Sequence, residues 1–169
     1  MKYHLQLFDS VIKNQKEIID QCLHVKENYN GTDLTWDYSK YNIFSVTSGS
    51  LYFFEIYKEL SLLFKEQLGD RPMWFQSWLN VHDNDTLLDW HNHAWDYHGY
   101  ISIDPKNTIT EFEEYKIFNK VGQVYFGPGN RLHRVVGEEK FSGPRITIGF
   151  DVTLDPFMDH GCYSLFPII

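Results

Sequence analysis

The hydrophobic and polar positions of the first 70 residues follow two different periods. Residues 3–7 alternate, which is the period of a half-buried strand. The apolar members of that alternation are Tyr3, Leu5 and Leu7. Helical spacing then holds over residues 10–29, and again from about Ser48 until Gly69 and Pro72 interrupt it. The pattern therefore predicts one strand followed by two helices.

From Met73 onward, short runs of β-branched and aromatic residues alternate with clusters of turn-forming residues. We expect strands near residues 73–81, 87–92, 99–103, 112–118, 122–126, 132–136 and 145–153. This number and spacing of strands is typical of a sandwich or jelly roll. The predicted fold is mostly β, with the two N-terminal helices buttressing one outer face.

The length of 169 residues fits a single domain, residues 1–169. No internal repeat or linker divides the chain, so we interpret residues 1–72 as mainly helical support and 73–153 as the jelly-roll core. Cys22 and Cys162 have no short spacing that would indicate a disulfide scaffold or a zinc knuckle. We expect both to be free thiols in a reducing compartment.

The charge of the chain narrows the possible partners. A formal net charge of −8, with no cluster of basic residues, argues against a nucleic-acid partner. The N-terminus lacks the apolar core of a signal peptide, and no apolar run approaches the length of a membrane span. We therefore expect a soluble, cytoplasmic protein that binds neither nucleic acid nor membrane.

Histidines provide the strongest chemical signal, because five of the eight lie between positions 82 and 133. His91 and His93 are two residues apart, so on a strand they would project from the same face and converge on one metal ion. His133 follows a Gly-Pro turn and could supply a third ligand from another strand. A bare H-x-H pair is also common among ordinary surface histidines, so only the combination of the three favours a metal site.

The segment from Arg145 to Phe150 alternates in a way that indicates an anion-binding face. Arg145 and Thr147 share one face of the predicted strand, and apolar residues occupy the other. If the polar face points into the barrel, the guanidinium and the hydroxyl are suited to holding a carboxylate. An exposed edge strand would give the same pattern, but an interior arginine requires an anionic partner.

Taken together, these motifs resemble the jelly-roll core of the Fe(II)- and 2-oxoglutarate-dependent oxygenases over about residues 73–153. The similarity is narrower still to a small prolyl-hydroxylase-like branch of bacteria and their phages. The matching positions are Trp78-Leu79-Asn80-Val81, His91-Asn92-His93, Gly99-Tyr100-Ile101-Ser102, Gly129, His133 and Arg145-Ile146-Thr147. The resemblance implies a double-stranded β-helix, with Fe(II) at the histidines and the distal carboxylate of 2-oxoglutarate on Arg145 and Thr147.

One position departs from the family pattern. Most such oxygenases use two histidines and one carboxylate, but His93 stands where the carboxylate of H-x-D is expected. His93 could be a third neutral ligand, which we favour, or nearby Asp96 could replace it. Alternatively, His91 and His133 alone hold the iron, with water completing the coordination and His93 orienting the cosubstrate.

The leading functional expectation is a dioxygenase that uses 2-oxoglutarate and dioxygen to hydroxylate an unidentified substrate. A protein side chain such as proline, or a small metabolite, fits this expectation equally well. The competing hypotheses are a three-histidine cupin-type metalloprotein, acting as an isomerase or a cofactor-free dioxygenase, and a non-catalytic jelly-roll structural protein.

Overall fold

A computed structural model describes residues 2–29, 41–155 and 164–168 of the chain. Its helices are α1 (Asp9–Lys13), α2 (Gln15–Asn28), α3 (Ile43–Val46) and α4 (Leu51–Leu68). Its strands are β1 (His4–Leu7), β2 (Met73–His82), β3 (Tyr97–Asp104), β4 (Thr108–Phe112), β5 (Lys116–Phe118), β6 (Gln123–Pro128), β7 (His133–Gly137), β8 (Arg145–Thr153) and β9 (Phe166–Ile168). After the short strand β1, the chain therefore runs from helices into strands, as the sequence predicts.

Local side-chain chemistry sets where the helices begin and end. The helix predicted over residues 10–29 is divided, because the Asn14 side-chain amide donates a hydrogen bond to the Ser10 carbonyl and the Asn14 backbone leaves the helical region. The Ser50 hydroxyl accepts from the Phe53 backbone N–H and caps α4. Gly69 ends α4 with φ at 86°, which glycine adopts without strain.

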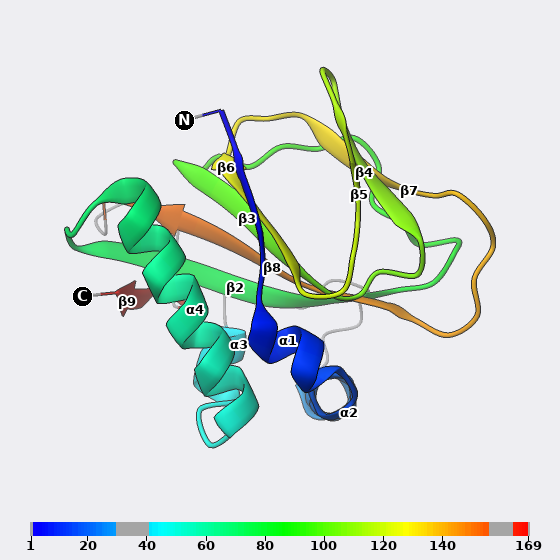
Figure 1. Ribbon diagram of the computed structural model, residues 1–169, viewed down its shortest axis with the longest axis horizontal. Coiled ribbons are helices and arrows are strands. Elements are labelled where there is room, and N and C mark those ends of the chain that lie inside the picture. The colour runs from blue at the N-terminus through cyan, green and yellow to red at the C-terminus, as the bar shows by residue number, and fades with distance from the viewer. Residues whose placement is uncertain (1, 30–40, 156–163, 169) are drawn as a thin grey trace.

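Two antiparallel sheets form the β layer (Figure 1). The larger has six strands in the order β1-β6-β3-β8-β2-β9, and the smaller has three in the order β5-β4-β7. Strands adjacent in space are mostly distant in sequence, as in β8 between β2 and β3. This arrangement confirms the predicted jelly-roll, or double-stranded β-helix, fold.

Two of the predicted strands are wrong in detail. Residues 87–92 form no strand and lie in the long connection between β2 and β3, where only His91 makes an isolated bridge. The sequence predicts one strand over residues 112–118, but the chain turns after Phe112, so that β4 and β5 are separate strands that pair antiparallel. In both places the apolar runs are short, and short runs do not distinguish a strand from a packed loop.

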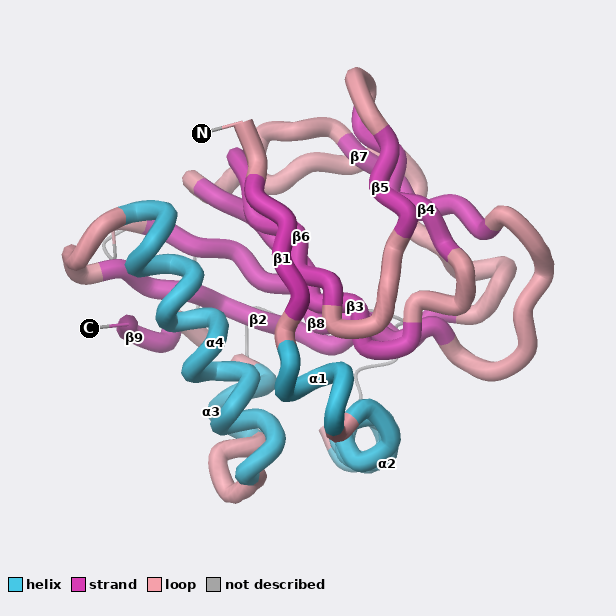
Figure 2. The backbone as a smooth tube through the Cα atoms, viewed as in Figure 1, coloured by secondary structure: helices cyan, strands magenta, loops and turns pink. Residues whose placement is uncertain are grey.

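The helices cover one face of the large sheet (Figure 2). The alternation predicted for residues 145–150 is confirmed, because Ile146, Ile148 and Phe150 join the core under the helices. The ring of Phe64 on α4 packs against Phe126 and Phe150, with centroids 5.2 and 5.4 Å apart. The polar residues of β8 consequently face the smaller sheet.

The N-terminal strand is confirmed, but the face expected to be half-buried is not. Leu5 and Leu7 are 37% and 56% exposed, whereas His4 and Gln6 between them are half-buried. β1 lies at the edge of the sheet and pairs only with β6. Periodicity shows which side chains share a face, but the position of the strand in the sheet decides which face is covered.

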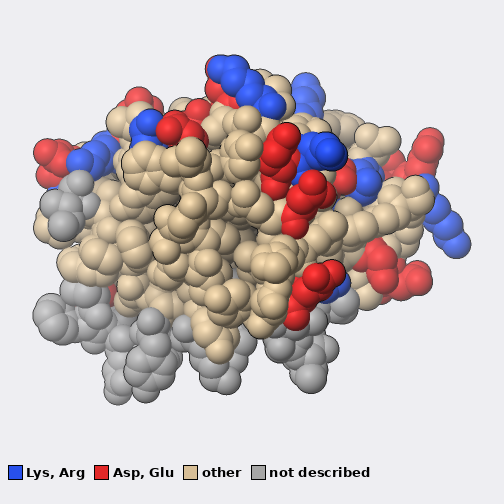
Figure 3. Space-filling view, turned by 90° about the horizontal axis from the view of Figure 1, so that it is seen from below, with Lys and Arg blue, Asp and Glu red and all other residues tan. Residues whose placement is uncertain are grey.

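The helix side of the molecule carries charges of both signs, intermixed toward its margin (Figure 3). Cys22 is buried and is a free thiol, whereas Cys162 lies outside the described residues. Burial raises the pKa of the Cys22 thiol to about 12. Among the described residues, none of the helices combines the length and the apolar character that crossing a bilayer demands.

Candidate metal centre and anion pocket

The polar face of the large sheet is organised in rows that cross β2, β8 and β3. The rows are Gln76–Asp151–His98, Trp78–Gly149–Tyr100, Asn80–Thr147–Ser102 and His82–Arg145. A Cβ at Gly149 would lie 2.6 Å from the indole of Trp78, so glycine leaves the space in which that ring crosses the sheet. Strand register thus places Asp151 and His98 at one end of the face and Arg145 at the other.

His91 and His93 reach this face from the loop between β2 and β3, not from a strand as expected. His91 and His133 exchange two backbone hydrogen bonds of 2.9 Å, and the His93 N–H donates to the Gly129 carbonyl at 2.9 Å. The loop is therefore fixed to the turn between β6 and β7. Through these bonds the structure brings His91, His93 and His133 together, although the geometry differs from a regular H-x-H strand.

Side-chain nitrogens of the three histidines lie within 4.8 Å of one another. Each ring uses Nδ1 for a hydrogen bond: His91 to the Asp89 carbonyl at 2.7 Å, His133 to the Arg131 carbonyl at 2.9 Å, and His93 to the Asp151 carboxylate at 3.3 Å. Since these oxygens only accept, the proton of each neutral ring is on Nδ1. The Nε2 lone pairs are therefore free to bind a metal.

Burial favours the uncharged form of His91 and His133. His133 is 4% exposed, and desolvation lowers its pKa to about 2. Desolvation also lowers the pKa of His91. A divalent ion therefore competes with few protons for these nitrogens near neutral pH.

His82 and His98 are also buried, and we predict that they make the folded protein less stable as the pH falls. Burial lowers the pKa of His82 and of His98 from 6.5 to about 4. A histidine with a lower pKa in the folded than in the unfolded chain binds its proton mainly on unfolding, so stability is lost as the pH falls. Between pH 6.5 and about 4, the free energy of unfolding of the metal-free protein should fall by about 1.4 kcal/mol per pH unit for each of them.

Urea unfolding of the metal-free protein at several pH values across this range measures the slope. His82→Gln should make the slope shallower, because it removes one of the buried histidines that bind a proton mainly on unfolding. A stability that does not change with pH between 6.5 and 4 would show that these rings are not held neutral.

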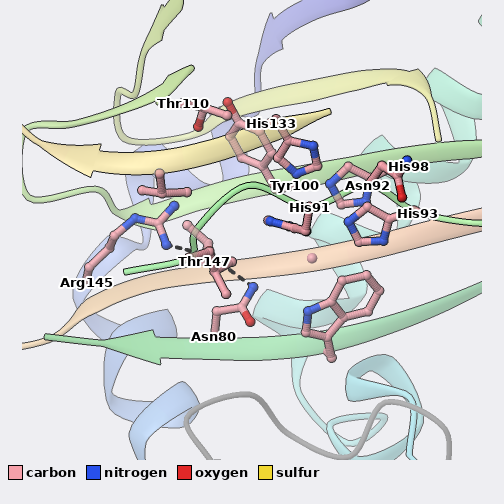
Figure 4. A pocket seen from close by; sticks show the side chains of 14 residues that line it. Asn80, His91, Asn92, His93, His98, Tyr100, Thr110, His133, Arg145 and Thr147 are labelled. Carbon is pink, nitrogen blue, oxygen red and sulfur yellow. Dashed lines mark hydrogen bonds between the residues drawn. The ribbon is translucent and has the colours of Figure 1, made fainter. Parts of the chain in front are cut away.

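Arg145 and Thr147 occupy the other end of the pocket (Figure 4). Arg145 is 2% exposed and donates to the hydroxyls of Thr108 at 3.2 Å and Thr147 at 3.4 Å. No ion pair of the described residues includes Arg145, and burial lowers its pKa to about 10. A buried guanidinium whose side-chain partners in the described part of the chain are hydroxyls is suited to an anionic ligand.

Both ends line one cavity of about 200 Å³. Within the described part of the chain, buried atoms without a hydrogen-bond partner include His93 Nε2 and Asn80 Oδ1. Asn80 also donates to the Thr147 hydroxyl at 3.4 Å. Buried polar atoms are normally satisfied, so these two indicate groups that a ligand completes. Imidazole donors suit a divalent transition metal, and the residues present fit a metal ion with an anion beside it.

Asp96, the alternative to His93, points elsewhere. Its carboxylate accepts hydrogen bonds from the Thr153 hydroxyl at 3.2 Å and the Leu154 N–H at 3.0 Å, at the end of β8. The groups of possible metal ligands found among the described residues do not include it. The structure therefore does not bring Asp96 to the three histidines.

Sequence reasoning missed two residues of this site. Asp151 continues the alternation that places Arg145 and Thr147 on one face, so the same pattern could have identified it. His98 falls just before the strand expected at 99–103, whereas β3 begins at Tyr97 and buries it. Its ring stacks on His93, with centroids 3.6 Å apart.

Gly129 permits the close contact that holds the histidine loop. A Cβ there would lie 2.1 Å from the Trp95 carbonyl oxygen, a backbone atom that cannot move alone. We expect Gly129→Ala to lower the free energy of unfolding by about 1 to 3 kcal/mol in chemical denaturation, because the loop must shift. Gly49→Ala is the matched control, since no atom lies within 4 Å of its Cβ position. Equal stability of the two variants would contradict the tight packing at Gly129.

Comparison with known proteins gives similarity of fold only. No protein-family model matches the sequence, and neither does any curated protein. The α-ketoglutarate-dependent carbocyclase SnoK from nogalamycin biosynthesis superposes with a TM-score of 0.64 at 10% identity, covering 89% of this chain and 78% of SnoK. A Pseudomonas putida prolyl-4-hydroxylase has a TM-score of 0.59 at 8% identity, over 89% of this chain and 86% of that one.

The epimerase SnoN was solved in complex with Fe³⁺, α-ketoglutarate and nogalamycin RO, and its TM-score is 0.62 at 8% identity over 89% of this chain and 78% of SnoN. SnoK and SnoN are non-heme, α-ketoglutarate-dependent enzymes, and the third structure is a prolyl-4-hydroxylase. They support the double-stranded β-helix fold of this chain, at identities too low to transfer an activity.

Proposed function

We propose that this protein is an Fe(II)- and 2-oxoglutarate-dependent dioxygenase. One observation carries the proposal: three imidazoles with free Nε2 lone pairs and a buried guanidinium without a carboxylate partner among the described residues line the same cavity. A metal site and an anion site in one cavity fit a cosubstrate that binds the metal at one end and carries a carboxylate at the other. The structures with similar folds agree with this proposal.

Each residue then has a defined task. His91, His93 and His133 hold Fe(II), and Arg145 with the Thr147 hydroxyl binds the distal carboxylate of 2-oxoglutarate. When bound, the iron supplies the chemistry by which 2-oxoglutarate and dioxygen become succinate and carbon dioxide, with one oxygen atom inserted into a substrate C–H bond. Trp78 forms an apolar wall of the cavity and stacks on His93, with centroids 5.8 Å apart, which limits the movement of that ring.

The proposal also covers the substrate that is hydroxylated. The C–H bond acted on is part of a protein side chain such as proline, or of a small metabolite. Leu88, Asn92 and Val135 line the cavity together with the histidines, so a substrate approaching the metal contacts them. A cytoplasmic site of action is part of the same proposal, and the two cysteines without disulfide spacing support it.

Titration calorimetry tests the proposal on metal-free, untagged protein under anaerobic conditions. We expect Mn(II) to bind in one equivalent, and 2-oxoglutarate to bind only afterwards. With Fe(II) and air, 2-oxoglutarate should be converted slowly to succinate without a prime substrate. Metal binding without any effect of 2-oxoglutarate would favour the three-histidine cupin-type protein, and no metal binding would favour a structural jelly roll.

A further inference from the structure

Asp151 occupies a position directly behind one of the three histidines of the cavity. It lies on β8, on the same face as Arg145 and Thr147, and is 2% exposed. Its Oδ1 is 3.0 Å from His93 Nδ1 and 2.9 Å from His98 Nδ1, and its Oδ2 accepts from the Gln76 amide at 3.1 Å. Three donors from β2, β3 and the histidine loop thus converge on one buried carboxylate.

This contact distinguishes His93 from the other two histidines. His91 and His133 direct Nδ1 to neutral backbone carbonyls, whereas His93 directs it to a charged carboxylate. A hydrogen bond to an ionised acceptor is roughly twice as strong as a neutral one. It fixes the ring with Nε2 facing the cavity and increases the electron density that the ring donates to a metal.

We propose that Asp151 is a positioning residue that supplies, through His93, the negative charge that a carboxylate ligand would otherwise bring to the metal. The inference rests on the proposed function, since it concerns a metal at His91, His93 and His133. The H-x-H sequence places a neutral imidazole where two-histidine sites have a carboxylate. The carboxylate comes instead from β8 and acts one ring away from the metal.

The surroundings of Asp151 support a fixed role. The ring of His98 lies parallel to that of His93, with an interplanar angle of 10°. His98 donates to Oδ1 of Asp151 at 2.9 Å and His93 donates to Oδ2 at 3.3 Å, so both rings are held by one carboxylate. Trp78 stacks on both rings. The donors leave Asp151 little freedom, so it holds His93 in one orientation.

The experiment compares metal binding by the full-length protein and two variants, using Co(II) with a competing chelator. Asp151→Asn keeps the side-chain shape and removes the charge, and we expect its Co(II) affinity to fall by about 10- to 100-fold. The ligand-field absorption spectrum of bound Co(II) should also change, because His93 becomes a weaker donor. Asp96→Asn is the matched control: Asp96 accepts hydrogen bonds near the same loop without contacting a histidine of the site. Its affinity and spectrum should equal those of the wild type.

Three outcomes would overturn the inference. Unchanged affinity and spectrum in Asp151→Asn would show that the carboxylate does not act on the metal. Two Co(II) equivalents in the wild type and one in Asp151→Asn would make Asp151 a ligand of a second ion, together with His93 and His98. Equal loss in Asp96→Asn would show a general effect of charge or stability. If the wild type binds no Co(II), the proposed metal site itself fails.

A measurement on the unaltered protein keeps the inference testable if Asp151→Asn does not fold. In the Zn(II)-loaded wild type, the ring Nδ1 proton of His93 should appear further downfield in proton–nitrogen NMR spectra than those of His91 and His133. This follows from its hydrogen bond to a carboxylate rather than a carbonyl. Three similar shifts, or a His93 without an Nδ1 proton, would contradict the inference.

Discussion

Replacing His133 with alanine should abolish metal binding. Of the three histidines, His133 belongs to a regular strand and is the most buried, and its backbone also holds the loop that carries His91. Loss of an outer partner of a metal ligand typically costs 10- to 100-fold in affinity, so loss of a ligand should cost more than about 100-fold. Because 2-oxoglutarate requires the metal, its binding should disappear as well. Competition with a chromophoric chelator measures the first effect and calorimetry the second.

His24→Ala is the control for this variant. His24 lies exposed on α2, away from the cavity, and its removal should leave metal affinity unchanged. Circular dichroism of both variants checks whether the fold is retained. If His133→Ala binds Mn(II) as tightly as His24→Ala, the three-histidine site is contradicted.

Replacing Arg145 with methionine should separate the cosubstrate from the metal. Truncating one partner of a buried charge pair typically costs about 2 to 5 kcal/mol, which corresponds to a loss of roughly 30-fold or more in 2-oxoglutarate affinity. Metal affinity should not change, because the guanidinium is held by Thr108 and Thr147 and not by the histidines. Calorimetry with Mn(II) first and 2-oxoglutarate second measures both quantities.

The same substitution should not destabilise the protein in the absence of ligand. Arg145 is buried without a carboxylate partner among the described residues, and exchanging buried charged groups for apolar residues of similar volume is often neutral or stabilising. Thermal unfolding of the metal-free protein should therefore be unchanged or shifted upward. Arg71→Met, at an exposed position beyond α4, is the control for removal of a positive charge. A variant that binds 2-oxoglutarate like the wild type contradicts the assigned role of Arg145.

The sequence predicts the elements of this fold well wherever a long regular pattern exists. The nine residues of β8 alternate without interruption, and over Arg145–Phe150 the apolar face lies in the core as expected. The pattern is less informative for β1, because alternation does not show that an edge strand leaves Leu5 and Leu7 uncovered. The histidine loop is beyond pattern analysis, since its shape depends on backbone hydrogen bonds to Gly129 and His133, about 40 residues later in the chain.

The residues of the candidate site were likewise predictable where they lie close together in the sequence, and not where they come from distant segments. Arg145 and Thr147 are two apart on one strand, so local spacing is enough to place them together. The contact between His93 and Asp151 joins the loop before β3 to β8, and no local rule connects those segments. Strand register brings His98 and Gln76 to the same carboxylate, which the sequence alone does not specify.

A crystal structure of the protein grown anaerobically with Mn(II) and 2-oxoglutarate tests the central claim most directly. We predict one anomalous scattering peak bonded to the Nε2 atoms of His91, His93 and His133, with 2-oxoglutarate reaching from the metal to a carboxylate contact with Arg145. A metal bound elsewhere, or a 2-oxoglutarate molecule that leaves Arg145 without an anionic partner, would contradict the account.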